Sequence, residues 1–291
     1  MKSPFQPFEP PAPGYEGGER AAPSEKRRIP LRHIVPNLIT IVAICAGMTG
    51  MRLAFEGRFE LAVGLVIAAA LLDGIDGRIA RMMKGQSRFG AEMDSLADIV
   101  NFGVVPAMVL YAYSLHDAGS AGWIAALLYA ATCALRLARF NTMLDAPKPA
   151  WQTKFFTGVP APAGAGLAFF PVYLGFSGFD FGIGPRPAAL FAAAYLLFVG
   201  FLMASRIPTF SGKTISIRVR RDLVIPVTLC VVLYIVLLAS FLWETLVVTV
   251  IAYFVSILFS MRDYRRSVRR YGMAVEPLPT DERTDTDPSG A

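Results

Sequence analysis

The chain has 291 residues, of which 54% are hydrophobic and only 17% are charged, whereas soluble domains carry about 25% charged residues. This composition excludes a water-soluble globular protein, and its high apolar content also excludes an intrinsically disordered chain. The three cysteines, Cys45, Cys133 and Cys230, all lie in apolar runs, which excludes a disulfide scaffold. The sequence therefore predicts an all-α, polytopic membrane helix bundle.

Apolar runs and polar segments alternate along the chain. Residues 1–28 form a Pro-rich polar tail, for which we expect disorder. Six apolar runs follow within residues 29–205, two more within residues 206–262, and residues 263–291 form a tail that is first basic and then acidic. Since a membrane helix needs about 20 apolar residues, the sequence predicts eight spans, at 37–55, 60–82, 90–114, 121–140, 159–177, 187–205, 223–242 and 244–261.

Lysine and arginine predict the orientation of these spans. All but Arg52, Arg58 and Arg186 of the 28 basic residues lie in the tails or around the loops after the second, fourth and sixth spans. Basic loops stay on the cytoplasmic side, so we expect an integral inner-membrane protein with both termini in the cytoplasm. The net charge of +6 is spread over several segments, so we expect membrane lipid and no nucleic acid as a partner.

Four aspartates interrupt the apolar pattern at the predicted cytoplasmic end of the second and third spans. At 100° per residue, Asp73 and Asp76 lie about 60° apart on one helix face, and Asp94 and Asp98 about 40° apart on another. The residues between the pairs suffice for a hairpin that turns these faces toward each other. Converging carboxylates bind hard divalent cations such as Mg²⁺, Mn²⁺ or Ca²⁺, so the pattern predicts a metal site with an active site facing the cytoplasm.

An alternative interpretation is a structural charge cluster. In it the aspartates pair with the nearby arginines Arg78, Arg81 and Arg88 at the membrane interface. This alternative accounts for the charges, but it accounts neither for the facing of the aspartates nor for the small residues aligned with them.

Small residues beside the aspartates predict a hollow that a ligand can enter. Gly77 and Ala80 fall within about 40° of Asp73 on the helical wheel, and Gly90 falls about 40° from Asp94. Arg81 can reach a phosphate or a carboxylate with two hydrogen bonds. Glu92 points about 160° away from Asp94 and is therefore excluded from the predicted site.

The eight residues Asp73, Asp76, Gly77, Ala80, Arg81, Gly90, Asp94 and Asp98 form the pattern DxxDGxxAR, eight residues, then GxxxDxxxD. This pattern resembles that of the CDP-alcohol phosphatidyltransferase family. The segment PNLIT at 36–40 is also similar to the family, whereas DSLADIVNFGVVPA at 94–107, RLARFN at 136–141 and FFTGVPAPAGAG at 155–166 resemble its serine-using branch. The resemblance covers the first six spans and makes residues 29–205 the catalytic core.

The resemblance implies a reaction and roles for particular residues. A phosphatidyl group passes from CDP-diacylglycerol to L-serine, giving phosphatidylserine and CMP, in a homodimeric enzyme. Two divalent ions, Mg²⁺ or Mn²⁺, are held by the four aspartates, and Asp98 is also the catalytic base. The expected contacts to the CDP group are Asn37, Thr40, Gly77, Ala80, Arg81, Ser87 and Gly90.

Residues that would bind the acceptor are predicted from the charged groups of serine. Arg136 or Arg139 can supply a cation for the carboxylate of serine, and Asn101 or Asn141 can bind its amino group. Glycerol 3-phosphate, inositol phosphate or choline remain alternative acceptors.

Two other mechanisms fit less well. A cation-coupled transporter would carry counterparts of these acids in its second half. A covalent histidine route is excluded because neither His33 nor His116 is followed two residues later by lysine.

Overall fold

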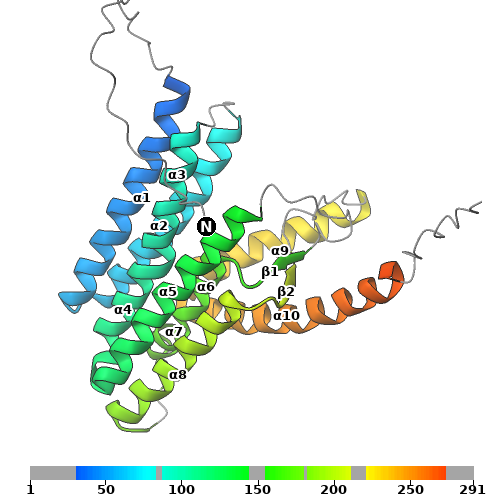
Figure 1. The fold of residues 1–291 in the computed structure, drawn as a ribbon. Helices are drawn as coiled ribbons and strands as arrows, with labels where there is room; N and C mark the ends of the chain where they lie inside the picture. Colours follow the sequence, from blue (N-terminus) through cyan, green and yellow to red (C-terminus); the bar gives the residue numbers. More distant parts are fainter. Residues whose placement is uncertain (1–30, 83–86, 144–154, 180–181, 211–220, 273–291) are drawn as a thin grey trace, which may run out of the picture.

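The computed structural model describes residues 31–82, 87–143, 155–179, 182–210 and 221–272. Within these ranges the chain is a helix bundle, in which α1 (Leu31–Phe55), α2 (Phe59–Met82), α5 (Ser120–Thr142) and α8 (Pro185–Ala204) are long helices (Figure 1). The all-α membrane-bundle prediction is confirmed. The predicted N-terminal tail, residues 273–291 of the predicted C-terminal tail and parts of four loops lie outside the described residues. Residues 263–272, which were predicted to belong to the C-terminal tail, continue the last helix.

The predicted third span is helical throughout but changes its type of helix. It consists of α3 (Arg88–Asp98), a π-helical segment η1 (Ile99–Val104) and α4 (Val105–Tyr113), followed by the short 3-10 helix η2 (Leu115–Ala118). The predicted fifth span is also divided, into α6 (Ala161–Ala168) and α7 (Phe170–Phe176), which are separated at Phe169. Two helices, α9 (Arg221–Ser240) and α10 (Leu242–Gly272), complete the fold and extend to one side of the bundle (Figure 1).

Five helical segments among the described residues are long and apolar enough to cross a membrane. They are Ile34–Phe55, Phe89–Tyr113, Ser120–Thr142, Pro185–Ala204 and Leu242–Ser267, with a shorter apolar helix at Val224–Ser240. Helix α2 has the necessary length, but Asp73, Asp76, Arg78 and Arg81 lie toward its C-terminal end. The predicted positions all carry helices, whereas the number of eight spans stays a prediction.

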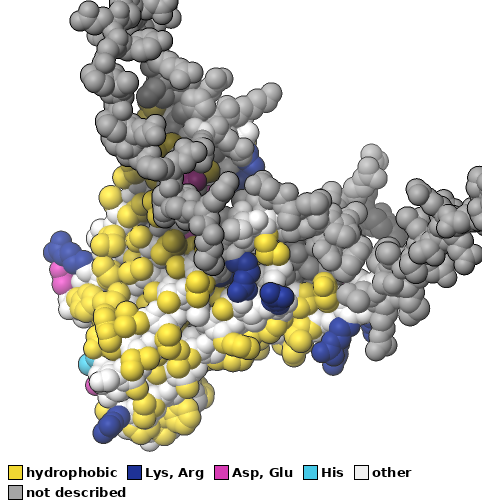
Figure 2. Space-filling view, in the orientation of Figure 1, with side chains coloured by type: hydrophobic (Ala, Val, Ile, Leu, Met, Phe, Trp, Pro, Cys, Tyr) yellow, Lys and Arg dark blue, Asp and Glu magenta, His cyan; other side chains and the backbone are white. Residues whose placement is uncertain are grey.

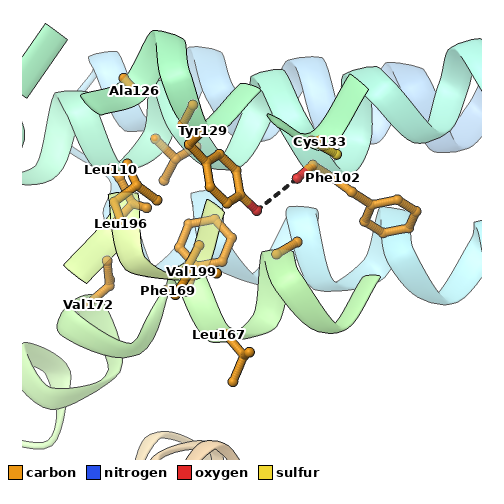
Figure 3. Close-up of a cluster of buried hydrophobic side chains, with 14 of the residues drawn as sticks. Phe102, Leu110, Ala126, Tyr129, Cys133, Leu167, Phe169, Val172, Leu196 and Val199 are labelled. Carbon is orange, nitrogen blue, oxygen red and sulfur yellow. Dashed lines mark hydrogen bonds between the residues drawn. The ribbon is translucent and has the colours of Figure 1, made fainter. Parts of the chain in front are cut away.

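The outside of the bundle is apolar, as expected for a protein whose solvent is lipid. Ile225 and Leu229 on α9 and Phe191 on α8 are among many large hydrophobic side chains that are exposed. Figure 2 shows hydrophobic side chains over much of the described surface of the bundle. The buried core lies where α5 and α8 pack on α4, α6 and α7, and it includes Tyr129, Phe169 and Leu196 (Figure 3).

A two-stranded antiparallel ribbon, which was not predicted, joins the ends of two helices. Strand β1 (Phe155–Thr157) precedes α6, and β2 (Pro208–Phe210) follows α8, with Phe156 paired to Thr209. The Thr209 hydroxyl donates a hydrogen bond of 2.8 Å to the Gly158 carbonyl, and the Gly158 N–H donates one of 2.8 Å to the Ile207 carbonyl. These bonds fix the entrance to α6 against the end of α8.

Candidate metal and substrate site

The C-terminal half of α2 and the helix that begins at α3 bring the four aspartates together. Asp73, Asp76 and Asp94 each offer a carboxylate oxygen, and these oxygens lie within 4.8 Å of one another. Asp98 lies one turn after Asp94, and its carboxyl group is within hydrogen-bonding contact of Asp73. The two aspartate-bearing helix faces thus lie opposite each other, as the spacing predicts.

No salt bridge joins these aspartates to Arg78 or Arg81 among the described residues. Arg81 acts on Asp94 only through a longer-range electrostatic interaction, and the side chain of Arg88 lies outside the described residues. The described part of the site therefore lacks the carboxylate–arginine pairs that the alternative of a structural charge cluster requires.

The donor set fits a hard divalent cation. One oxygen of Asp73 and one of Asp76, Oδ1 in each, are buried and have no hydrogen-bond partner. A buried carboxylate oxygen without a partner is costly, and neighbouring carboxylates repel one another. A cation bound between them would satisfy both requirements, and an all-oxygen site favours Mg²⁺, Mn²⁺ or Ca²⁺ over softer metals.

Thr40 on α1 fixes the orientation of Asp76. The Thr40 hydroxyl lies 2.6 Å from Oδ2 of Asp76 and 3.1 Å from the Pro36 carbonyl oxygen. A hydroxyl has a single hydrogen to donate, and the shorter contact to the carboxylate takes it. Both side chains are buried, at 4% and 2% exposure, so Oδ1 of Asp76 remains the oxygen that is available to a cation.

A cavity of about 260 Å³ opens beside the aspartates, between α1, α2 and the start of α3. Six of the seven residues expected to contact the CDP group line it, and the seventh, Ala80, has a side chain outside the described set. The lining residues are Pro36, Asn37, Thr40, Asp76, Gly77, Arg81, Ser87, Gly90, Ala91 and Asp94. Pro36 and Ala91 were not among the predicted site residues, although Pro36 begins the PNLIT segment and Ala91 follows Gly90.

Gly90 allows α1 to approach the first turn of α3. A Cβ atom at Gly90 would lie 2.9 Å from Oδ1 of Asn37 and 3.1 Å from Oγ of Ser87. The Ser87 oxygen also accepts a hydrogen bond of 3.0 Å from the Gly90 N–H and so caps α3. Any larger residue at position 90 would push Asn37 and Ser87 apart at the wall of the cavity.

The four candidate acceptor residues fall into two groups. Arg139 donates a hydrogen bond of 2.6 Å to the Ala204 carbonyl, and Nδ2 of Asn141 donates one of 3.0 Å to Oγ of Ser95; both residues are exposed. Asn101 and Arg136 are buried, and the amide oxygen and nitrogen of Asn101 and Nε of Arg136 have no partner. Two of the four candidates are therefore engaged elsewhere, and two hold buried polar atoms that are unsatisfied.

The fold and the site together define a class: a polytopic membrane protein with a carboxylate cluster that could hold a metal ion, beside a polar cavity. The family model described as CDP-alcohol phosphatidyltransferase matches residues 33–204. A second model, CDP-alcohol phosphatidyltransferase 2, matches residues 222–257. The chain belongs to the CDP-alcohol phosphatidyltransferase family, and the second match covers α9 and part of α10, where the sequence analysis found no motif.

Several curated relatives are similar over most of the chain. A CDP-diacylglycerol–serine O-phosphatidyltransferase of Mycobacterium leprae (strain TN) is 40% identical over 246 residues, which cover 84% of this chain and 79% of the relative. The protein with that name in Mycobacterium tuberculosis (strain ATCC 25618 / H37Rv) is 38% identical, covering 84% of this chain and 83% of the relative. One from Helicobacter pylori (strain J99) is 40% identical over 142 residues, covering 49% of this chain and 58% of the relative.

Proposed function

We propose that this protein transfers the phosphatidyl group of CDP-diacylglycerol to L-serine and releases CMP. The observation that carries the proposal is the convergence of Asp73, Asp76 and Asp94, with Asp98 beside them, at the edge of a polar cavity. Membership of the family and relatives that carry this enzyme name over 84% of the chain support the same reaction.

The four aspartates would hold two divalent ions, Mg²⁺ or Mn²⁺. When bound, such ions neutralise the charge of the pyrophosphate and of the departing CMP. Asp76 is held for this task by Thr40, whereas Asp73 and Asp94 reach the same point from facing helices. Phosphoryl transfer depends mainly on positioning and charge neutralisation, and the bundle supplies the positioning.

The polar cavity would receive the CDP part of the substrate. Arg81 faces it with a guanidinium group suited to phosphate oxygens. Asn37 and Ser87 contribute polar side chains on the other side of the opening. A Cβ atom at Gly77 would meet only Arg81, at 3.6 Å, so the absence of a side chain there leaves room for the ligand.

Asp98 is the proposed base. The serine hydroxyl oxygen attacks the phosphorus that carries the diacylglycerol, its proton passes to Asp98, and the bond from that phosphorus to the oxygen of CMP breaks. A poor nucleophile such as a hydroxyl needs a base within hydrogen-bond reach. Asp98 lies beside Asp73 and on the deeper turn of the helix, where it can serve an acceptor that enters next to the metal ligands.

The proposed location follows from the substrates and the charges. CMP and serine are soluble and the acyl chains are not, so a site at the cytoplasmic interface of the inner membrane meets all of them. The basic residues around the loops after α2, α5 and α8 favour that side, which would place both termini in the cytoplasm. A homodimer is proposed from the family resemblance.

An acceptor panel tests this function. The purified chain in lipid nanodiscs is given labelled CDP-diacylglycerol with serine, glycerol 3-phosphate, inositol phosphate or choline, and CMP release is measured. We expect release with serine alone and its loss in the Asp76→Asn variant. Release with another acceptor and none with serine would overturn the choice of substrate.

A further inference from the structure

The π-helical segment η1 lies directly between Asp98 and the apolar half of the same span. The Val105 N–H bonds to the Val100 carbonyl, five residues earlier, where an α-helix would use the fourth. Pro106 has no N–H and so cannot bond to the carbonyl four residues before it, that of Phe102. Segments of π-helix are rare and concentrate at functional sites, which makes the position of this one beside Asp98 informative.

Helix α5 supplies the hydrogen bond that Pro106 cannot make. The Tyr129 hydroxyl donates a hydrogen bond of 3.0 Å to the Phe102 carbonyl, and the Tyr129 side chain is fully buried (Figure 3). Gly103 packs closely on the same helix, since a Cβ atom there would lie 3.1 Å from Cβ of Cys133. The altered turn is therefore held in place by α5.

The segment places Asn101 in a buried position with its amide unsatisfied. Asn101 is 1% exposed, and neither its side-chain oxygen nor its nitrogen has a partner. Room for it comes from Gly47 on α1, where a Cβ atom would lie 2.5 Å from the amide oxygen. An unsatisfied buried amide destabilises a fold, so this arrangement is better explained by a polar ligand than by packing.

Arg136 is a second buried group of this kind and also borders Asp98. It is 8% exposed, its Nε has no partner, and its charge acts on Asp98. Its guanidinium lies 5.8 Å from the centre of the Phe140 ring. An acceptor whose hydroxyl lies at Asp98 would therefore have the Arg136 guanidinium on one side and the Asn101 amide about one helical turn after Asp98.

We propose that Asn101 and Arg136 bind the charged groups of an amino-acid acceptor, and that Tyr129 is the positioning residue that holds η1 and thereby Asn101. This inference rests on the proposed function. The amide oxygen of Asn101 accepts from the ammonium group, while its nitrogen and the Arg136 guanidinium donate to the carboxylate. A zwitterionic acceptor satisfies all three buried atoms that have no partner, which are Oδ1 and Nδ2 of Asn101 and Nε of Arg136. Choline has no carboxylate and cannot do so.

The test compares Asn101→Leu and Tyr129→Phe with wild type by the KM for serine, the KM for CDP-diacylglycerol and the thermal unfolding midpoint. Tyr195→Phe is the matched control, because the Tyr195 hydroxyl also bonds to a backbone carbonyl, that of Leu167 at 2.9 Å. We expect the KM for serine to rise about tenfold or more in both variants. Asn101→Leu loses hydrogen bonds to the charged groups of serine, and Tyr129→Phe loses the bond to the Phe102 carbonyl that holds Asn101 in position. The KM for CDP-diacylglycerol should change little, and the control should leave both values unchanged.

Stability separates a binding role from a structural one. Leucine has nearly the shape of asparagine and no polar atoms, so Asn101→Leu should unfold at the wild-type temperature or higher. A serine KM that stays at the wild-type value in Asn101→Leu would overturn the inference, as would equal increases in both KM values for Tyr129→Phe. If the wild-type protein released no CMP with serine, the proposed function itself would be wrong. That result differs from an unchanged serine KM in Asn101→Leu, which would overturn only the inference about acceptor binding.

Discussion

At the residue scale, the site depends on which carboxylate oxygens remain free. Thr40 occupies one oxygen of Asp76, and the other is buried without a partner beside the oxygens of Asp73 and Asp94. Asp98 lies one turn further along its helix than Asp94, and the cation that acts on it is the buried Arg136, whereas the cation that acts on Asp94 is the exposed Arg81. In the proposed mechanism the same residue type would therefore serve two roles, set by its neighbours: three carboxylates for metal binding, and one that also accepts a proton.

The proposed role of Asp98 as base predicts the effect of a single substitution. Asp98→Asn should lower kcat by about a hundredfold or more, because general base catalysis contributes roughly that much, while CDP-diacylglycerol still binds. Turnover and lipid binding are measured on the same preparation. Glu92→Gln is the control, since Glu92 lies on the exposed side of α3 and should keep wild-type turnover. Wild-type kcat in Asp98→Asn would remove this residue from the role.

At the element scale, two irregular pieces hold the regular helices in place. The π-helical segment joins α3 to α4, and the β1–β2 ribbon joins the start of α6 to the end of α8. Gly158 lies at the second junction with φ of +78°, and a Cβ atom there would lie 2.6 Å from the Met203 carbonyl oxygen. Glycine is required at this position both for its backbone conformation and for the close approach of α8.

Gly158→Ala should therefore destabilise the fold. The left-handed conformation alone costs a residue with a side chain about 1–2 kcal/mol, and the clash with two backbone carbonyls adds to it. Gly57→Ala separates the conformational cost from the cost of the clash, because Gly57 has φ of +77° but nothing within 4 Å of its Cβ position. Thermal unfolding in detergent should show a larger drop for Gly158→Ala than for Gly57→Ala. Equal drops would mean that the packing against α8 contributes nothing.

The regular elements could be predicted from sequence, and the irregular ones could not. The convergence of the aspartates follows from the 100° step of a helix together with a short connection. The same helical wheel places Gly90 on the face of Asp94. The strand pair depends on two segments about 50 residues apart meeting, which no local pattern indicates. Pro106 lies within an apolar run and cannot donate to the Phe102 carbonyl, a signal that the sequence analysis did not use. That Tyr129 satisfies this carbonyl became evident only from the packing of α5.

At the scale of the whole molecule, the apolar exterior and the basic loops determine how the protein lies in the membrane. Exposed hydrophobic side chains cover the bundle (Figure 2), and the sequence distribution of Lys and Arg distinguishes its two ends. The aspartates lie toward the basic end, near Arg78 and Arg81. We therefore expect the site and the basic loops to face the same compartment.

Cysteine labelling tests that orientation. In a variant with Cys45, Cys133 and Cys230 replaced, Asp117→Cys should react with a membrane-impermeant thiol reagent added to intact spheroplasts. Arg206→Cys should react only in inverted vesicles, because it follows α8 at the basic end. Asp117 and Arg206 are both exposed, so accessibility within the fold does not bias the comparison. Labelling with the opposite sidedness would reverse the proposed topology.

If the converging aspartates hold divalent ions on which phosphatidyl transfer depends, removing those ions should abolish the reaction. The most direct measurement is serine-dependent CMP release by the purified chain after chelation, followed as Mn²⁺ or Mg²⁺ is added back. We expect no release in chelator and a saturable recovery with either ion, and we expect Asp73→Asn to lose this recovery. Undiminished release in excess chelator would contradict this expectation.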